Sequence, residues 1–141
     1  MADAGYEPVA NDEYIYRRIP VKEKDWYDHN ISPAPTPSAF QPRRDDTTGL
    51  SVLRAKYFED IEKAAQGKSP YGYYVAVLRV GDLRSNGIDV VPKPLENNPG
   101  HAEILGITYQ NKNTDQIKEW KNLLAHKLTL RVEGPFASST T

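Results

Sequence analysis

The chain of 141 residues contains no cysteine and no long apolar run. The absence of cysteine excludes a disulfide scaffold, a thiolate zinc site and a cysteine nucleophile. The longest apolar run, YYVAVL at residues 73–78, stops at Arg79, whereas a membrane-spanning helix needs roughly 20 consecutive apolar residues. The composition is that of a soluble globular protein, and we expect no contact with a membrane.

An excess of charge of either sign is also missing. The chain carries 18 Lys and Arg residues against 19 Asp and Glu residues, which gives a net charge of -1. Its basic doublets, at residues 17–18 and 43–44, are short, and two aspartates follow the second. General nucleic-acid binding requires basic residues concentrated on one face, so we expect none here. No basic segment followed by an apolar one marks a secretory signal near the N-terminus, and the expected location is the cytoplasm.

The hydrophobic pattern predicts one small α+β domain over residues 13–134, between a disordered lead at 1–12 and a frayed tail at 135–141. Strands are predicted where the chain is β-branched and aromatic, continuously apolar, or alternating in polarity. Such segments lie near residues 14–19, 73–80, 88–91, 103–107 and 128–132.

A first helix is predicted from about residue 53. Leu53, Tyr57 and Ile61 recur at helical spacing, and Gly67 follows as a typical C-terminal cap. Residues 50–54 fit either the start of this helix or a strand.

A second helix is predicted to begin at Asn113 or Thr114, either of which is a favourable N-cap. Its apolar stripe continues towards Leu128, where the pattern changes to strand alternation. His126 lies near the end of this helix, and a structural role at the negative end of the helix dipole is sufficient to explain it.

Two long irregular segments, residues 31–49 and 92–100, interrupt these elements. Four prolines exclude a helix or a central strand from the first segment. In the second, Pro99-Gly100 fits the central pair of a type II turn, in which glycine takes a positive φ. Loops of this length are usually functional or mobile. The expected fold is therefore a mixed or antiparallel sheet with two helices and two long proline-rich loops.

His101 and Glu103 are the first candidate site. At positions i and i+2 of a strand, their side chains share one face. A histidine and a carboxylate are suited to acid–base chemistry, yet such a pair at the start of a strand is also common on a solvated surface. No further ligand stands at a fixed spacing, so we predict no metal site.

The segment RRDDTTG at residues 43–49 is the second candidate. The guanidinium groups of Arg43 and Arg44 suit phosphate or carboxylate, and Thr47 and Thr48 supply hydroxyl groups. Alternatively, the two aspartates neutralise the arginines within the loop. Tyr16 is a further candidate for a ligand contact, although tyrosines in strands are more often core residues.

Three segments, YIYRRIP, SAFQPRRDDTTGLSV and VVPKPLENNPGHAEI, resemble segments of small bacterial proteins of uncharacterised function. This resemblance implies no particular activity.

Three short pieces also resemble ADP-ribosyltransferases of the Arg-Ser-Glu type. In that family an arginine on the first strand grips the NAD phosphate, a serine on the second strand orders the site, and a glutamate on a late strand hydrogen-bonds the ribose. Arg17, Ser51 and Glu103 match these roles in order. The chain departs from the family in having Leu50-Ser51-Val52 where Ser-Thr-Ser is usual, and His101 where a glutamate or glutamine is favoured.

Two functions follow from this reading, and the sequence does not decide whether the protein is an enzyme. The first is a binding or interaction module that uses loops 31–49 and 92–101 to contact a protein partner or a small anionic ligand, without a cofactor. The alternative is an NAD-consuming enzyme that resembles ADP-ribosyltransferases, with Arg17, Ser51, Glu103 and His101 in its site. We favour the first, because no complete catalytic constellation is visible in the sequence.

Overall fold

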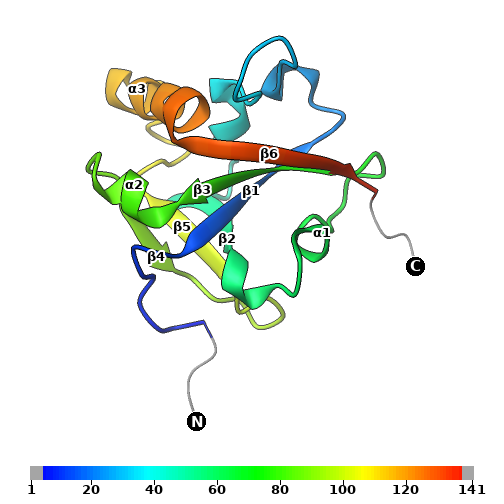
Figure 1. The fold of residues 1–141 in the computed structure, drawn as a ribbon. Helices are drawn as coiled ribbons and strands as arrows, with labels where there is room; N and C mark the ends of the chain where they lie inside the picture. The colour runs from blue at the N-terminus through cyan, green and yellow to red at the C-terminus, as the bar shows by residue number, and fades with distance from the viewer. Residues whose placement is uncertain (1–4, 138–141) are drawn as a thin grey trace.

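The computed structural model describes residues 5–137 and contains a six-stranded sheet (Figure 1). Its strands are β1 (Tyr14–Pro20), β2 (Gly49–Arg54), β3 (Tyr73–Arg79), β4 (Val90–Pro92), β5 (His101–Leu105) and β6 (Thr129–Phe136). Its helices are α1 (Ile61–Ala64), α2 (Val80–Arg84) and α3 (Asp115–Leu123), with 3-10 turns at Lys24–Trp26, Pro37–Phe40 and Ala55–Tyr57 and a π-helical turn at Leu124–Leu128. The predicted disordered lead and frayed tail lie outside the described residues at positions 1–4 and 138–141.

All neighbouring strands pair antiparallel, in the order β4-β5-β2-β1-β3-β6. This confirms the expected α+β class. Residues that oppose each other in an antiparallel pair point to the same face of the sheet. The register therefore separates each strand into two sets of side chains, one for each face.

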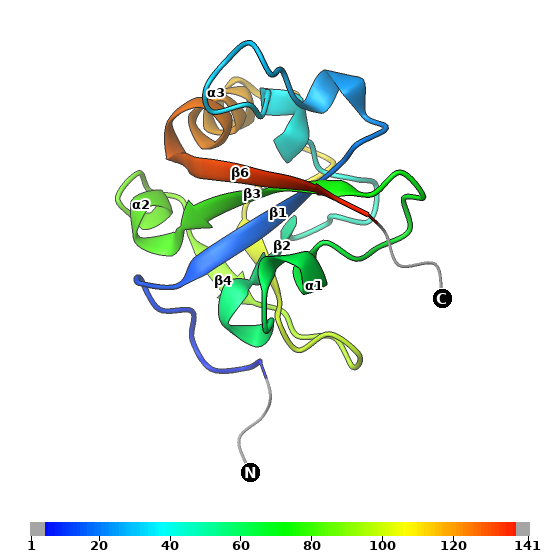
Figure 2. The same cartoon turned by 45° about the vertical axis from the view of Figure 1, so that its right-hand side comes forward.

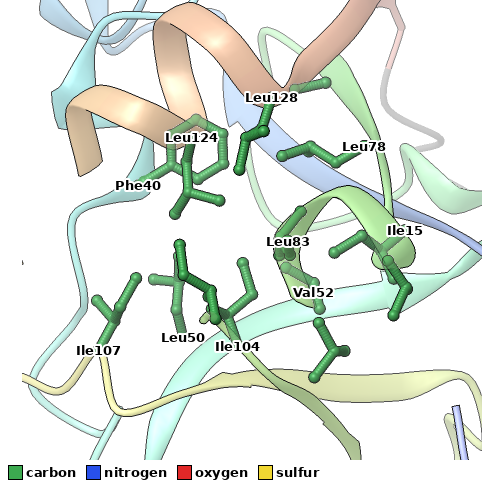
Figure 3. Close-up of a cluster of buried hydrophobic side chains, with 14 of the residues drawn as sticks. Ile15, Phe40, Leu50, Val52, Leu78, Leu83, Ile104, Ile107, Leu124 and Leu128 are labelled. Atoms are coloured by element: carbon green, nitrogen blue, oxygen red, sulfur yellow. The ribbon is translucent and has the colours of Figure 1, made fainter. Parts of the chain in front are cut away.

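One face of the sheet holds the main core. Side chains from the five strands β1 to β5, among them Ile15, Leu50 and Ile104, are buried there. α2, α3, the turn Pro37–Phe40 and the π-helical turn cover this face, and Figure 3 shows Leu124 and Phe40 close to Leu50 and Ile104. Burial of apolar surface on this scale is the main source of stability for a domain of this size.

The second face of the sheet carries a smaller apolar cluster. Tyr73 and Val75 of β3 pack there with Ala65, Tyr16 and Ile61. The segment that contains α1 lies over this face, and Figures 1 and 2 show α1 and α3 on opposite sides of β1. The rest of the second face is more polar, and it contributes to the pocket described below.

The predicted helix from residue 53 is largely wrong. Residues 49–54 form β2, which pairs with β5 over five positions, and the helix that follows, α1, has only four residues. The side chain of Asp60 caps α1 by accepting a hydrogen bond of 3.0 Å from the Lys63 backbone N–H. Pairing with β5 and burial of the alternating side chains of β2 outweigh the helical spacing in this part of the chain.

The second predicted helix is confirmed. Thr114 is the N-cap of α3, and its Oγ1 accepts a hydrogen bond of 3.3 Å from the Ile117 backbone N–H. The helix passes through the π-helical turn, which contains His126 as an exposed residue, and β6 begins at Thr129 as the change in pattern predicts.

Residues 5–12, expected to belong to the disordered lead, have defined contacts. The guanidinium group of Arg54 is fully buried and donates hydrogen bonds to the backbone carbonyls of Gly5, Glu7 and Pro8. Arg54 also binds the carboxylate of Glu13, with Nη2 to Oε2 at 2.8 Å. A buried arginine thus fixes a segment whose composition alone resembles a flexible lead.

The prediction that Gly100 takes a positive φ in a type II turn is wrong, because Gly100 does not have a positive φ. A Cβ atom at this position would instead lie 2.8 Å from the Cβ of Tyr57. Glycine is required here because another segment of the chain approaches closely.

Neither proline-rich segment is free of structure. In the loop 31–49, Ala39 and Phe40 are buried in the main core, and an isolated bridge pairs Tyr27 with Pro35. In the segment 92–100, an isolated bridge pairs Leu95 with Asn98. None of the helices between residues 5 and 137 is long and apolar enough to cross a membrane.

Candidate functional site

The two central strands β1 and β2 separate after a short paired region. They pair at Ile15↔Arg54 and Tyr16↔Leu53, and the next position of β1, Arg17, uses its side chain to bridge the gap. Its Nη1 donates to the Ser51 carbonyl at 2.9 Å, and its Nε and Nη2 donate to the carbonyls of Ala39 and Gln41 at 2.9 and 3.3 Å. We call this separation of β1 and β2 the fork.

A pocket of about 400 Å³ lies at the fork. This volume falls within the range of small-molecule sites. β1, β2, the loop 31–49, the first residue of β5 and the segment after α1 all contribute side chains to its wall. The charged residues among them are Arg17, Arg18, Arg43, Lys68, Asp45 and Asp46.

The pocket gathers three guanidinium groups, those of Arg17, Arg18 and Arg43. Among residues 5–137, no carboxylate lies within ion-pair distance of any of the three. Burial lowers the pKa of Arg17 to about 10; the carboxylate of Asp46 opposes this at longer range, and the charges of Arg43 and Arg18 add to it. Burial also lowers the pKa of Arg18, as does the charge of Arg43, while Tyr73 opposes the change. A guanidinium group carries its charge at neutral pH, so the three side chains repel one another.

Aromatic rings support these cations. The guanidinium carbons of Arg17 and Arg43 lie 5.9 and 6.0 Å from the centre of the Trp26 ring, and that of Arg18 lies 5.3 Å from the centre of the Tyr73 ring. Contacts of this kind hold a guanidinium group in place without neutralising its charge.

A chain of hydrogen bonds runs along one wall of the pocket. The Oγ of Ser51 lies 3.2 Å from Nε2 of His101 and donates to Oδ1 of Asp46 at 3.1 Å. Nδ1 of His101 lies 2.8 Å from the backbone carbonyl of Lys93. Asp46 is buried, and its Oδ2 accepts a hydrogen bond of 2.7 Å from the Arg43 backbone N–H. The arrangement joins a hydroxyl, an imidazole and a carboxylate at the surface of one cavity.

Five of the residues singled out in the sequence line this pocket: Tyr16, Arg17, Arg43, Ser51 and His101. They come from β1, β2, β5 and the loop 31–49, so the structure brings both candidate segments to the same cavity.

The other four singled-out residues do not line the pocket. Glu103 lies opposite Ser51 in the sheet register, but its Oε1 accepts a hydrogen bond of 2.6 Å from the Thr48 hydroxyl. Arg44 and Thr47 are exposed outside the wall of the cavity. Of the Arg-Ser-Glu set, the structure thus brings Arg17 and Ser51 into one cavity and places Glu103 against Thr48.

Sequence reasoning did not select Arg18, Trp26 or Lys68 as site residues. Arg18 had a visible signal, because strand alternation places it on the same face as Tyr16. Trp26 and Lys68 reach the pocket from separate turns, and no local pattern marks their convergence.

No cluster of three or more His, Asp or Glu side chains within residues 5–137 is arranged to bind a metal ion.

Comparison of the chain with protein-family models, with curated proteins and with solved structures finds no match.

Proposed function

We propose that this domain binds a small molecule bearing a phosphate or carboxylate group in the pocket at the fork. The observation that supports the proposal most directly is the presence of Arg17, Arg18 and Arg43 in one cavity without an ion-pair partner among the described residues.

Three like charges in a partly buried cavity raise the free energy of the empty protein, because burial weakens solvent screening. An anion entering the cavity would replace this repulsion by charge-assisted hydrogen bonds, which are among the stronger polar contacts in proteins. Arg17 already uses three nitrogens on backbone carbonyls, whereas within residues 5–137 Arg18 uses only Nη1, on the carbonyl of Gln66. Arg43 and Arg18 are therefore the expected direct ligands, and Arg17 contributes mainly its charge.

The pocket contains residues of both loops that were expected to carry the function, 31–49 and 92–101. Arg43 and Asp46 come from the loop 31–49, and His101 ends the loop 92–101. Anion binding is better supported than the NAD-consuming alternative, because Glu103, the carboxylate that the alternative requires, is bonded to Thr48 and does not line the cavity.

Thermal unfolding in the presence of anions tests the proposal. Inorganic phosphate, pyrophosphate, adenosine monophosphate and citrate are each compared with chloride at equal ionic strength. A ligand at 100 times its Kd stabilises the folded state by about 2.7 kcal/mol, which a melting curve resolves easily. We expect at least one of these anions to stabilise the protein beyond the effect of chloride.

Arg43→Gln is the decisive variant, and Arg44→Gln is its matched control. Both arginines are exposed neighbours in one loop, and only Arg43 lines the cavity. The loss of one charge-assisted hydrogen bond costs about 1.5–3 kcal/mol, so Arg43→Gln should weaken anion binding by roughly tenfold or more. Equal binding by the two variants, or the absence of stabilisation by any of the anions, would contradict the proposal.

A further inference from the structure

Ser51 and His101 meet at the wall of the same cavity, and the chemistry of their contact extends the proposed function. We infer that Ser51 is a nucleophile and His101 its general base, and that the pocket cleaves carboxylic esters that carry an anionic group. This inference rests on the proposed function, because the arginines would hold the anionic group of the substrate.

The orientation of His101 is fixed by the backbone. The carbonyl oxygen of Lys93 can only accept, so Nδ1 of His101, at 2.8 Å from it, must carry a proton. In the neutral ring Nε2 is then an acceptor, and it faces the hydroxyl oxygen of Ser51 at 3.2 Å. A base beside a hydroxyl, with its other nitrogen held by a third group, is the arrangement that activates a serine.

Asp46 competes with His101 for the single hydroxyl proton of Ser51. Its Oδ1 lies 3.1 Å from Oγ, and Nε2 of His101 lies 3.2 Å from Oγ. Rotation of the hydroxyl selects between the two acceptors. Once His101 has taken the proton, its Nε2–H is the donor that can protonate the leaving oxygen.

With His101 as the base, the presence of a single imidazole beside Ser51 favours acyl transfer over phosphoryl transfer. In phosphoryl transfer the attacking and leaving oxygens lie in line on opposite sides of phosphorus, so a single imidazole cannot reach both. In acyl transfer both oxygens are bonded to one tetrahedral carbon, and the same imidazole can take a proton from the first and give it to the second.

The reaction balances without a further reagent. Oγ of Ser51 attacks the ester carbonyl carbon while its proton moves to Nε2 of His101, and the C–O bond to the alcohol breaks as His101 protonates the leaving oxygen. Water then attacks the acyl-serine and gives a proton to His101, which returns it to Oγ as the carboxylic acid leaves. The cationic wall of Arg17, Arg18 and Arg43 binds the anionic group of the substrate and favours the negative charge on the carbonyl oxygen.

Hydrolysis of para-nitrophenyl esters tests the inference. The full chain is assayed with mono-para-nitrophenyl glutarate, whose acyl group carries a carboxylate, and with the neutral para-nitrophenyl acetate. We expect a higher kcat/KM for the anionic ester and an acyl adduct located on Ser51 by mass spectrometry of the quenched enzyme. Hydrolysis no faster than the buffer blank, or an adduct that maps to another residue, would overturn the inference.

Variants of Ser51 and His101, each with a matched control, test the roles of these two residues. Ser51→Ala and His101→Asn should each lower kcat/KM for the glutarate ester by at least about a hundredfold, the lower range of a general-base contribution. The asparagine amide can still donate to the Lys93 carbonyl, so His101→Asn keeps the local backbone contact. The exposed residues Ser85 and His126 supply the controls, and Ser85→Ala and His126→Asn should retain full activity.

The variant Asp46→Asn shows which of the two acceptors, His101 or Asp46, takes the hydroxyl proton of Ser51. If His101 is the base, removing the competing carboxylate leaves most of the activity in place; if Asp46 is the base, activity is lost in Asp46→Asn and kept in His101→Asn, and the inference fails. Should any variant unfold, the site of the adduct on the wild-type protein still decides whether Ser51 is the nucleophile.

Thermal shifts with phosphate distinguish the failure of this inference from the failure of the proposed function. Anion binding without ester cleavage overturns the inference alone and leaves the binding function in place. Absence of both overturns both.

Discussion

Replacement of Glu13 by glutamine tests how strongly the buried Arg54–Glu13 pair holds the N-terminal segment to the sheet. Glu13 accepts three N–H groups, from Ala10 at 2.8 Å and from Nε and Nη2 of Arg54 at 2.9 and 2.8 Å. The side chain of Arg54 is 0% exposed and that of Glu13 is 7% exposed, so water cannot take over these contacts.

The expected loss of stability follows from the geometry of this pair. In Glu13→Gln the amide oxygen can take the place of only one of the two carboxylate oxygens, so in either orientation the NH₂ group faces one N–H donor of Arg54. The buried guanidinium group also loses the closer of its two carboxylate partners and keeps, within residues 5–137, only the exposed Glu7 carboxylate at 3.9 Å. Breaking a buried ion pair in this way costs about 3–5 kcal/mol. At about 3 °C per kcal/mol for a protein of this size, the melting temperature should fall by roughly 10–15 °C.

The effect should depend on pH with a defined sign. Burial by itself raises the pKa of Glu13, but hydrogen bonds from Arg54 and Ala10 and the charges of Arg54 and Lys56 outweigh it, so that the pKa is lowered from its usual 4.5. A carboxyl whose pKa is lower in the folded state stabilises the protein above its unfolded pKa and loses this contribution as the pH falls through the folded pKa. The difference between the wild type and Glu13→Gln should therefore be constant near neutral pH and shrink below about pH 5.

Urea denaturation at several pH values measures both quantities, and Glu59→Gln is the control. Glu59 is 81% exposed and contacts Lys63 at 3.8 Å, and an exposed pair of this kind contributes less than about 0.5 kcal/mol. If Glu13→Gln and Glu59→Gln gave equal losses at neutral pH, Arg54 would not be desolvated as described, and its role in fixing residues 5–12 would be refuted.

Three further substitutions test the core, a helix cap and a close approach of the backbone. Ile104→Ala removes a fully buried core side chain and should cost about 2–5 kcal/mol in urea unfolding, whereas Leu130→Ala, at a position 49% exposed, should stay within about 0.5 kcal/mol. Thr114→Ala removes the hydroxyl that caps α3 and should cost about 1 kcal/mol, and Thr114→Ser should restore most of it if the cap is the cause. Gly100→Ala places a Cβ atom 2.8 Å from that of Tyr57 and should cost about 1–3 kcal/mol; a melting temperature equal to that of the wild type would show that the two segments can move apart.

The arrangement at the fork explains why a domain with balanced charge contains a cationic cavity. Arg17 and Arg18 are adjacent on β1 and point to opposite faces of the sheet, yet both reach the opening where β1 and β2 separate. Arg43 joins them from a loop that Phe40 anchors in the core. A net charge of -1 therefore describes the whole chain and not this part of its surface.

At β2 the local sequence fits two different secondary structures. The alternation of Leu50, Val52 and Arg54 and the helical spacing of Leu53, Tyr57 and Ile61 overlap in the chain, so local pattern supports both states. The strand forms because β5 pairs with it over five positions, and β5 lies about 50 residues further along the chain. The burial of Arg54 could not be predicted from local sequence either, because none of its neighbours in the chain indicates that Glu13 will neutralise its charge.

Features that depend on local patterns could be predicted from the amino-acid sequence. Periodicity and capping were sufficient for the α+β class, for the helix that begins after Thr114 and for strands β1, β3, β5 and β6. The shared cavity of Ser51, His101 and three arginines could not be predicted in this way. It depends on strand order, on the separation of β1 and β2, and on a loop held by its own buried residues. Contacts between residues distant in the chain follow from the packing of the whole core, which no local segment encodes.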